Sequence, residues 1–286
     1  MQIIQKAVIL CAGKGTRFYP ITSVLPKEML PLYNKPVLHY IVLEIIKSGI
    51  TNICFVINKQ KQSIIDYFAN KENINKTIQI LKKQNNHTDA DELQFILDKG
   101  KFSFVYQENP TGSGSAVECT KSFVMDESFL LSCGDDIILG NSSEQLMRAF
   151  QVFNATIIGT KCIDTPDIVK YGVIDIDKTY SFDRLQLDNQ LISSGDIAKC
   201  KGIIEKPSLD KAPSNIVSVG KYILTPTIWD ALQNINCSAN GEYLLTDALQ
   251  ILCEDRVFSC NLSGNRYDIG DAQSMIKAIV DLLHTN

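Results

Sequence analysis

Apolar runs of strand length alternate with helical periodicity through the first half of the chain. Residues 7–10, 53–57, 102–106 and 129–133 are rich in apolar side chains and each is long enough for one strand. Between them, residues 38–46 carry apolar positions at the spacing of one helix face, which Gly49 can end. This alternation predicts an α/β fold, with a mostly parallel mixed sheet and helices on both faces.

The pattern changes twice along the chain. Residues 70–101 are polar and rich in Lys, Asn and Gln, with amphipathic fragments that predict a helical excursion at the surface. The second half is more mixed and predicts a small additional β element. Strand patterns cover 171–176, 185–192, 202–204 and 216–224, and helical patterns cover 227–232, 243–252 and 272–283. The end of the chain, 243–286, is therefore expected to be a C-terminal helical region. No linker or repeat divides the chain, so we expect a single domain over 1–286.

Composition narrows the function classes only slightly. The 286 residues are 45% hydrophobic and 21% charged, and the net charge of −4 gives no electrostatic reason to expect a nucleic acid or an anionic membrane as partner. No apolar run reaches the roughly 18 residues of a membrane span, and the N-terminus lacks a signal-peptide pattern. The nine cysteines include no C-x-x-C pair, which is typical of reduced thiols. These features predict a cytoplasmic protein.

A glycine-containing loop follows the first apolar run. Gly13 and Gly15 free backbone N–H groups, and Thr16, Arg17 and Lys27 add a hydroxyl and fixed positive charge. Together these groups favour a cradle for a polyphosphate. A lone G-x-G is also common in tight strand-to-helix turns, and that alternative stays open for the loop taken alone.

The loop matches neither of the two commonest nucleotide motifs. The dinucleotide fingerprint G-x-G-x-x-G requires a third glycine where the chain has Phe18. The phosphate loop fails as well, because Gly13-Lys14 is followed by Gly15. A nicotinamide-dependent dehydrogenase, which would share the sheet, is therefore disfavoured.

A pair of acids follows the apolar run 129–133. Asp135 and Asp136 come at the expected carboxyl end of a strand, where ligands bind in open α/β sheets. Mg²⁺ takes one or two carboxylates together with substrate phosphates. The pair therefore predicts a magnesium site, although aspartate at a loop start can also serve only as a turn residue.

Longer motifs point to one family. The chain resembles the sugar-nucleotide pyrophosphorylases, which are nucleotidyltransferases acting on sugar 1-phosphates. The resemblance begins at the glycine loop and at Pro26-Lys-Glu-Met-Leu-Pro31 with Lys35-Pro36. It then continues in order through 107–114, 134–136, 171–174, 205–207, 212–215, 220–222, 241–247 and 267–270. The match covers almost the whole chain and implies a Rossmann-like nucleotidyltransferase fold.

The resemblance is strongest to the uridylyltransferase branch of the family. It implies transfer of a uridylyl group from UTP to α-D-glucose 1-phosphate, giving UDP-glucose and pyrophosphate, with Mg²⁺ as cofactor. It also implies a homo-oligomer, either a dimer or a tetramer. A thymidylyl- or cytidylyltransferase and a non-catalytic regulatory paralogue are the alternatives. The paralogue is disfavoured because the phosphate-binding and metal positions are all occupied by suitable residues.

The resemblance also implies a role for each site residue. Arg17, Lys27 and Lys206 are the expected catalytic cations, and Asp135 with Asp268 the expected metal ligands. The sugar phosphate is expected at Gly172, Glu205 and Lys206. The nucleotide is expected at Ala12, Gly13, Gly15, Thr16, Glu28, Gln107 and Gly112. Taken alone, Asp268 could instead be a helix cap.

Gln107 is expected to read uracil, because its amide offers both an acceptor for N3–H and a donor for O4. A polar loop before a helix is the simpler alternative for this segment. The chain departs from the family here. It has Gly112-Ser-Gly-Ser-Ala116 where the family usually has Gly-Leu-Gly-His-Ala.

Overall fold

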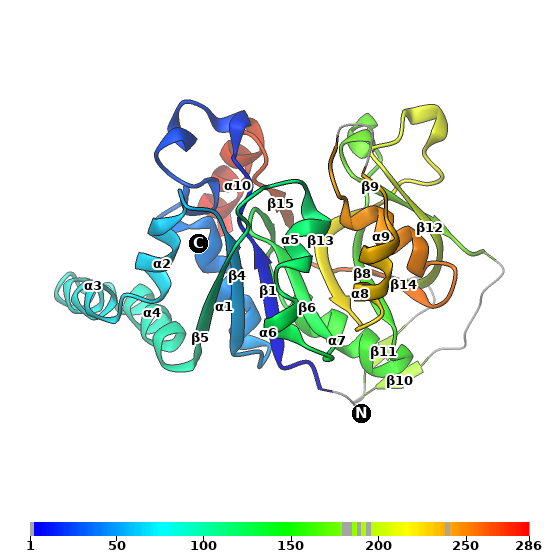
Figure 1. The fold of residues 1–286 in the computed structure, drawn as a ribbon. Coiled ribbons are helices and arrows are strands. Elements are labelled where there is room, and N and C mark those ends of the chain that lie inside the picture. The colour runs from blue at the N-terminus through cyan, green and yellow to red at the C-terminus, as the bar shows by residue number, and fades with distance from the viewer. Residues whose placement is uncertain (1–2, 179–184, 188–189, 193–195, 238–240, 286) are drawn as a thin grey trace.

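A nine-stranded sheet forms the centre of the computed structural model, which describes residues 3–178, 185–187, 190–192, 196–237 and 241–285. The strand order is β5-β4-β1-β6-β13-β8-β14-β12-β9 (Figure 1). The strands are β1 (Lys6–Leu10), β4 (Asn52–Ile57), β5 (Lys101–Tyr106), β6 (Phe129–Cys133), β8 (Thr156–Cys162), β9 (Gly172–Ile176), β12 (Ile197–Glu205), β13 (Ile216–Leu224) and β14 (Val257–Asn261). The α/β fold with a mixed sheet is confirmed.

The two halves of the sheet differ in strand direction. β5, β4, β1 and β6 run parallel to one another, as the βα alternation of the first half predicts. From β13 onward most pairs are antiparallel, and only β14 and β8 are parallel. The carboxyl ends of the four parallel strands therefore lie at one edge of the sheet.

Alternating side chains of the strands pack into two cores, one on each face. In β1, Ala7 and Ile9 join one core while Val8 joins the other, and all three are fully buried. The first core contains residues of α1 (Val37–Lys47) and α7 (Ser142–Phe153). The second contains residues of α5 (Ser113–Glu118), α8 (Ile228–Asn234) and α9 (Leu245–Leu252). Helices therefore cover both faces, as predicted (Figure 1).

Gly49 ends α1 as expected, at a φ of 97°. The segment before β6 forms two short helices in succession, α5 and then α6 (Lys121–Val124). The polar segment 70–101 is a helical hairpin of α3 (Lys71–Lys83) and α4 (His87–Lys99), preceded by α2 (Gln62–Phe68). This hairpin projects from the body with a small core of its own (Figure 1).

The end of the chain requires a correction. The region 243–286 contains α9 and α10 (Ala272–Thr285), but it also contributes β14 to the central sheet and β15 (Arg266–Asp268) to a two-stranded sheet with β7 (Asp136–Ile138). The small additional β element is present as the hairpin of β10 (Leu185–Leu187) and β11 (Gln190–Ile192). β2 (Pro31–Leu32) and β3 (Lys35–Pro36) form another short pair. Of the helices that the structure describes, none has the length and apolar character of a membrane span.

Candidate active site

One cavity of about 590 Å³ opens at the sheet edge where the carboxyl ends of the parallel strands lie. Six of the expected site residues line it, and they come from five separate parts of the chain: Arg17, Asp135, Gly172, Glu205, Lys206 and Asp268. Tyr171, Arg266, Ser113 and Thr246 also contribute to its wall. The fold therefore gathers the phosphate, metal and sugar candidates around one space.

The glycine loop borders this space with unused hydrogen-bond donors. Gly15 has a φ of 65°, and its carbonyl accepts a hydrogen bond from Thr22 Oγ1 at 2.7 Å. The backbone N–H groups of residues 12 to 16 donate no hydrogen bond to any residue that the structure describes. Exposed N–H groups in a turn of this kind can receive an anion.

Asn58 supports the same loop, and sequence reasoning missed it. Its Nδ2 donates to the carbonyl of Ala12 at 2.7 Å, while its Oδ1 accepts from the N–H of Gln60 at 2.8 Å. Asn58 follows β4 directly, so it stands at the same sheet edge as Ala12, which follows β1. Its position as a polar residue immediately after an apolar strand pattern could have indicated Asn58 from the sequence.

Arg17 lies at one end of the cavity with an unpaired guanidinium. It makes no ion pair or side-chain hydrogen bond within the described part of the chain. A Cβ built on Gly270 would be 2.9 Å from Arg17 Nη1, so the absence of a side chain at 270 leaves room for the guanidinium. Arg17 is therefore available to an anionic ligand.

Lys27 and its neighbour Glu28 take different positions. Both belong to a 3-10 turn, η3 (Lys27–Met29), and Lys27 forms an ion pair with Asp135. Burial opposes the charge of Lys27, but Asp135 and Glu28 outweigh it and raise the pKa of this ammonium. Lys27 is therefore a fixed cation placed directly against an expected metal ligand.

Glu28 is fully buried and lies outside the cavity lining. Its Oε2 pairs with Lys61 Nζ at 2.7 Å, whereas its Oε1 has no hydrogen-bond partner in the described part of the chain. Burial raises the pKa of Glu28, partly offset by Lys61 and Lys27. Glu28 therefore holds Lys61 in this structure, and its direct contact with a nucleotide stays an expectation from the resemblance.

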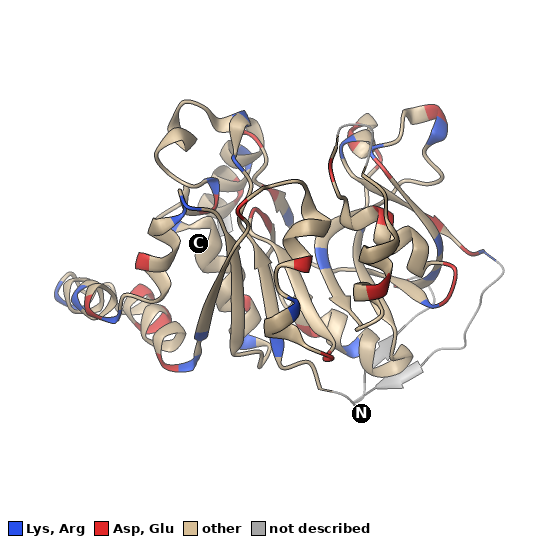
Figure 2. Cartoon of the chain, in the orientation of Figure 1, with Lys and Arg blue, Asp and Glu red and all other residues tan. Residues whose placement is uncertain are grey.

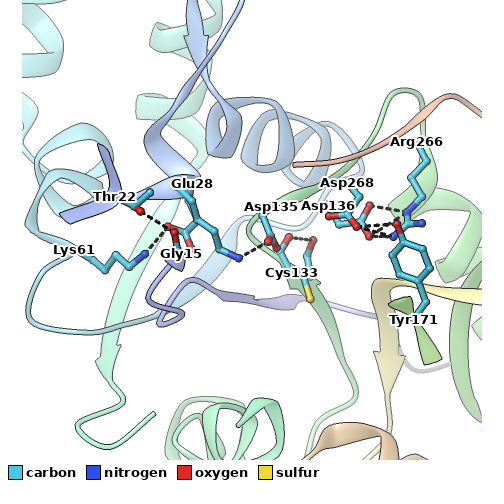
Figure 3. Close-up of polar contacts among 12 residues, drawn as sticks. Gly15, Thr22, Glu28, Lys61, Cys133, Asp135, Asp136, Tyr171, Arg266 and Asp268 are labelled. Carbon is cyan, nitrogen blue, oxygen red and sulfur yellow. Dashed lines mark hydrogen bonds and ion pairs between the residues drawn. The ribbon is translucent and has the colours of Figure 1, made fainter. Parts of the chain in front are cut away.

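Strand pairing places the remote Asp268 beside the Asp135-Asp136 pair. β15 runs antiparallel to β7 with Asp268 opposite Asp136, and the N–H of Ile269 donates to the carbonyl of Asp135 at 2.8 Å. Figure 3 shows the three carboxylates between Glu28 on one side and Arg266 with Tyr171 on the other. The convergence of Asp135 and Asp268 thus has a physical cause in the β7–β15 ladder.

Each of these aspartates has its own partner. Asp136 accepts a bidentate pair from Arg266 at 2.6 to 3.1 Å, with both side chains about nine-tenths buried. Asp268 accepts from the hydroxyl of Tyr171 at 2.9 Å, and the Arg266 guanidinium lies 4.4 Å from the centre of the Tyr171 ring. Arg266 was missed at the sequence level, where nothing distinguished it from a surface charge.

The acidic residues fit a cation shared with a substrate. The described residues contain no group of three His, Cys, Asp or Glu side chains able to hold a metal ion unaided. Asp135 and Asp268 nevertheless supply two carboxylates to one cavity, which is what Mg²⁺ requires when phosphate oxygens complete its coordination. The donor set therefore suits Mg²⁺ bound together with a phosphate ligand.

Glu205 and Lys206 close the opposite end of the cavity. β9 and β12 pair with Gly172 opposite Glu205, and a Cβ built on Gly172 would be 3.3 Å from Glu205 Oε2. That oxygen accepts from Thr246 Oγ1 at 2.8 Å. Lys206 Nζ lies 3.4 Å from Glu205 Oε1 with 60% of its side chain exposed, so its ammonium is accessible to an anion.

Gln107 and Gly112, the residues expected at the base, are not part of the cavity lining, but their neighbour Ser113 is. Gln107 follows β5 and is 4% exposed, and Nε2 of its amide donates to the carbonyl of Gly112 and to Ser115 Oγ. Gly112 has a φ of 127°, and a Cβ there would lie 2.2 Å from the carbonyl oxygen of Tyr243. Ser113, between them and α9, is the residue of this loop that lines the cavity.

The nucleotidyl transferase family model matches residues 6–285, which is nearly the entire chain. The chain belongs to the nucleotidyl transferase family. It is therefore an enzyme with a Rossmann-like nucleotidyltransferase fold.

Three relatives of this nucleotidyltransferase carry names that refer to UTP or UDP-glucose. A UTP–glucose-1-phosphate uridylyltransferase of Bacillus subtilis is 35% identical over 98% of this chain and 89% of its own. A crystal structure of a UDP-glucose pyrophosphorylase with UDP-glucose is 28% identical, covering 99% of this chain and 100% of its own at a TM-score of 0.86. A UTP-bound enzyme from Acinetobacter baumannii is also 28% identical, and the match covers 99% of this chain and 95% of that one at a TM-score of 0.82.

Charge is distributed unevenly within the nucleotidyltransferase site. Across the view of Figure 2, basic and acidic residues are interspersed over the whole molecule. Arg266 of the cavity lining is neutralised by Asp136, and Lys27, which lies outside the lining, is neutralised by Asp135. Arg17 and Lys206 line the cavity with accessible charges and follow β1 and β12, which lie on opposite sides of β6 and β13 in the sheet. This arrangement can hold two separate anions and bring them together between the ends.

Proposed function

We propose that this enzyme transfers a uridylyl group from UTP to α-D-glucose 1-phosphate, releasing UDP-glucose and pyrophosphate. The supporting observation is the single cavity that joins Arg17 and the two aspartates to Glu205 and Lys206. The named relatives and the solved structures reported above support UTP and glucose 1-phosphate as the substrates.

The reaction needs positioning and charge neutralisation more than proton transfer. A phosphate oxygen of glucose 1-phosphate attacks the α-phosphorus of UTP, and the bond from that phosphorus to the pyrophosphate oxygen breaks. The nucleophile is already an anion, so no side-chain base is required. The main barrier is the approach of two polyanions, which fixed cations in a cavity lower.

Three cations divide this work by position. Arg17, whose guanidinium has no partner among the described residues, holds the β- and γ-phosphates that leave as pyrophosphate. Lys206 holds the attacking sugar phosphate at the opposite end. Lys27, held against Asp135, stands between them and stabilises the charge that develops at the α-phosphate.

Asp135 and Asp268 would hold Mg²⁺ against the reacting phosphates. When bound, the cation supplies Lewis-acid charge to the phosphate oxygens. The protein's contribution is to hold the two carboxylates at fixed positions. The β7–β15 ladder, the Tyr171 hydroxyl and Lys27 provide this.

Backbone groups bind the rest of both substrates. The free N–H groups of Ala12, Gly13, Gly15 and Thr16 receive the nucleotide phosphates and the base edge. Gly172 and Glu205 face the sugar, where the missing side chain at 172 leaves room for the ring. We further propose that the enzyme is cytoplasmic and forms a homo-oligomer, which light scattering after size exclusion would test.

Pyrophosphate release measured with each of the four common ribonucleoside triphosphates, dTTP and several sugar 1-phosphates tests the assignment. We expect turnover with UTP and glucose 1-phosphate to exceed every other pair. Faster turnover with dTTP or CTP would replace this proposal with a thymidylyl- or cytidylyltransferase. No pyrophosphate release with any pair would indicate a regulatory paralogue.

A further inference from the structure

The amide of Gln107 is committed to the protein on one side only. Its Nε2 carries two hydrogens, and the two acceptors around it are the Gly112 carbonyl at 3.1 Å and Ser115 Oγ at 2.7 Å. The other amide atom, Oε1, receives no hydrogen bond from the described residues and is not sealed from solvent. Gln107 therefore has only an acceptor left for a ligand.

The two neighbours do not permit the reverse amide orientation. The Gly112 carbonyl can only accept a hydrogen bond. Ser115 donates its single hydroxyl proton to that same carbonyl at 3.0 Å, and it accepts from Thr111 Oγ1, also at 3.0 Å. A flipped amide would place Oε1 against the carbonyl and against a hydroxyl whose proton is already used. Both neighbours thus require the N–H side of Gln107.

The backbone fixes the Gly112 carbonyl in this place. Gly112 has a φ of 127° that L-residues rarely adopt. The loop is held on both sides by the backbone of Tyr243, whose N–H donates to the Thr111 carbonyl at 2.6 Å and whose carbonyl accepts from the Gly114 N–H at 2.9 Å. The acceptor that orients Gln107 is therefore part of a rigid turn.

We infer that Ser115 is a positioning residue that locks the Gln107 amide, so that the base site offers an acceptor to the ring and selects a pyrimidine carrying N3–H. Uracil presents N3–H, whereas cytosine presents an N3 lone pair and is repelled. The inference rests on the proposed function and on the expectation from the family resemblance that Gln107 reads the base. It differs from the sequence expectation that Gln107 also donates to O4, because both of its N–H groups are used inside the protein.

Ser115 occupies the position where the family usually has histidine. A hydroxyl can donate to the Gly112 carbonyl and accept from Gln107 at the same time, so it maintains the lock in this chain. Within Gly112-Ser-Gly-Ser-Ala116, the serine at residue 115 therefore takes over the task of holding the Gln107 side chain.

The test compares Ser115→Ala, Ser115→Thr and Thr111→Val with the wild type. Calorimetry gives the dissociation constants of UTP and CTP, and pyrophosphate release with glucose 1-phosphate gives kcat/KM for both. Ser115→Ala frees one N–H of Gln107, so we expect the preference for UTP over CTP to fall about tenfold, the range of one hydrogen bond. Ser115→Thr keeps the hydroxyl and should restore the preference. Thr111→Val removes the hydrogen bond to Ser115 but neither hydrogen bond of Gln107. It should leave the preference for UTP over CTP unchanged.

The outcomes separate this inference from the proposed function. If Ser115→Ala keeps the preference for UTP over CTP, or if Thr111→Val loses as much of it as Ser115→Ala, Ser115 does not position Gln107. Production of UDP-glucose by the wild type would still support the proposed function. A wild type that neither binds nor turns over UTP overturns both. Equal melting temperatures of the three variants and the wild type show that a change in preference does not come from unfolding.

Discussion

Three neighbouring aspartates illustrate how the partner of a residue decides its role. Asp135, Asp136 and Asp268 lie together because β7 pairs with β15. Asp136 is enclosed with Arg266 in a bidentate pair, whereas Asp268 keeps 28% of its side chain exposed, accepts a hydrogen bond from the Tyr171 hydroxyl and lies 4.0 Å from Arg266 Nη2. The first geometry serves stability and the second leaves charge available to a ligand.

Asp136→Asn and Asp268→Asn should therefore behave in opposite ways. Asp136→Asn removes the bidentate counter-ion of the buried Arg266, leaves it only the Asp268 carboxylate at 4.0 Å, and should cost about 3 kcal/mol of unfolding free energy. Asp268→Asn keeps an oxygen for Tyr171 and should change stability little, yet lower magnesium-dependent turnover about a hundredfold or more. Urea unfolding and pyrophosphate release on both variants measure this. A stable Asp136→Asn, or a fully active Asp268→Asn, would contradict the assignment.

Asp135 combines both properties, because it pairs with Lys27 as well as facing the cavity. Replacing it removes charge from the site and also removes the counter-ion of a mostly buried lysine. A lower melting temperature in Asp135→Asn would thus not argue against a metal role, which makes Asp268 the cleaner position for the test.

Lys206→Ala should weaken glucose 1-phosphate binding much more than UTP binding. Lys206 lines the cavity where we propose that the sugar phosphate binds, and a lost hydrogen bond to a charged group is worth about 1.5–3 kcal/mol before solvent screening. Because most of this side chain is exposed, we expect the lower end of that range. Separate calorimetric titrations check this, with Lys211→Ala, an exposed neighbour outside the cavity, as control. Equal losses for both ligands would remove the assignment.

At the scale of elements, the turn before α5 depends on close backbone contact. Gly112→Ala would place a Cβ 2.2 Å from the Tyr243 carbonyl oxygen in addition to the strain of a positive φ. Gly49 also has a positive φ, but a Cβ there meets nothing within 4 Å. We expect Gly49→Ala to cost about 1–2 kcal/mol and Gly112→Ala at least about 3 kcal/mol in urea unfolding. Similar costs would mean that the turn can shift.

The α3–α4 hairpin is attached to the body by ion pairs that respond to acid. Glu92 of α4 pairs with His39 of α1 at 3.1 Å and with Lys35 of β3 at 2.6 Å. The His39 hydrogen bond and the Lys35 charge, against partial burial, lower the pKa of Glu92 to about 2. A folded pKa below the unfolded value of about 4.3 gives stability that is present above that pH and lost as the pH falls toward 2.

Glu92→Gln should consequently destabilise the protein at pH 6 but much less at pH 3. Urea unfolding at both pH values measures the difference, and hydrogen exchange in residues 87–99 shows whether the hairpin loosens first. The same difference at both pH values would show that the carboxylate charge does not hold the hairpin.

Across the whole molecule, the sequence predicted local elements better than the contacts between them. The strand β8 was missed because Gly159 interrupts its pattern. In the structure, a Cβ at 159 would lie 2.7 Å from the Lys221 carbonyl oxygen, so the glycine permits close strand packing rather than a turn. The pairing of Arg266 with Asp136 was equally hidden, since 130 residues separate them and only the β7–β15 ladder joins them.

The site could be predicted where a motif is contiguous or matches the family. Arg17, Lys206 and Asp268 were expected from such motifs, and the structure brings them to one cavity. Asn58, Lys61 and Arg266 act through tertiary contacts that no local spacing encodes. Glu28 belongs to a matching motif but is fully buried, pairs with Lys61 and is absent from the cavity lining, because a motif does not specify which of its side chains line a cavity.

The central claim is that the cavity joins the uridylyl group of UTP to the phosphate of glucose 1-phosphate. UTP labelled separately at the α- and γ-phosphorus, incubated with the enzyme, Mg²⁺ and glucose 1-phosphate, tests this most directly. We predict that all of the transferred α-label appears in UDP-glucose and all of the released γ-label in pyrophosphate. Release of γ-label as inorganic phosphate, or its transfer to the sugar, would contradict the account.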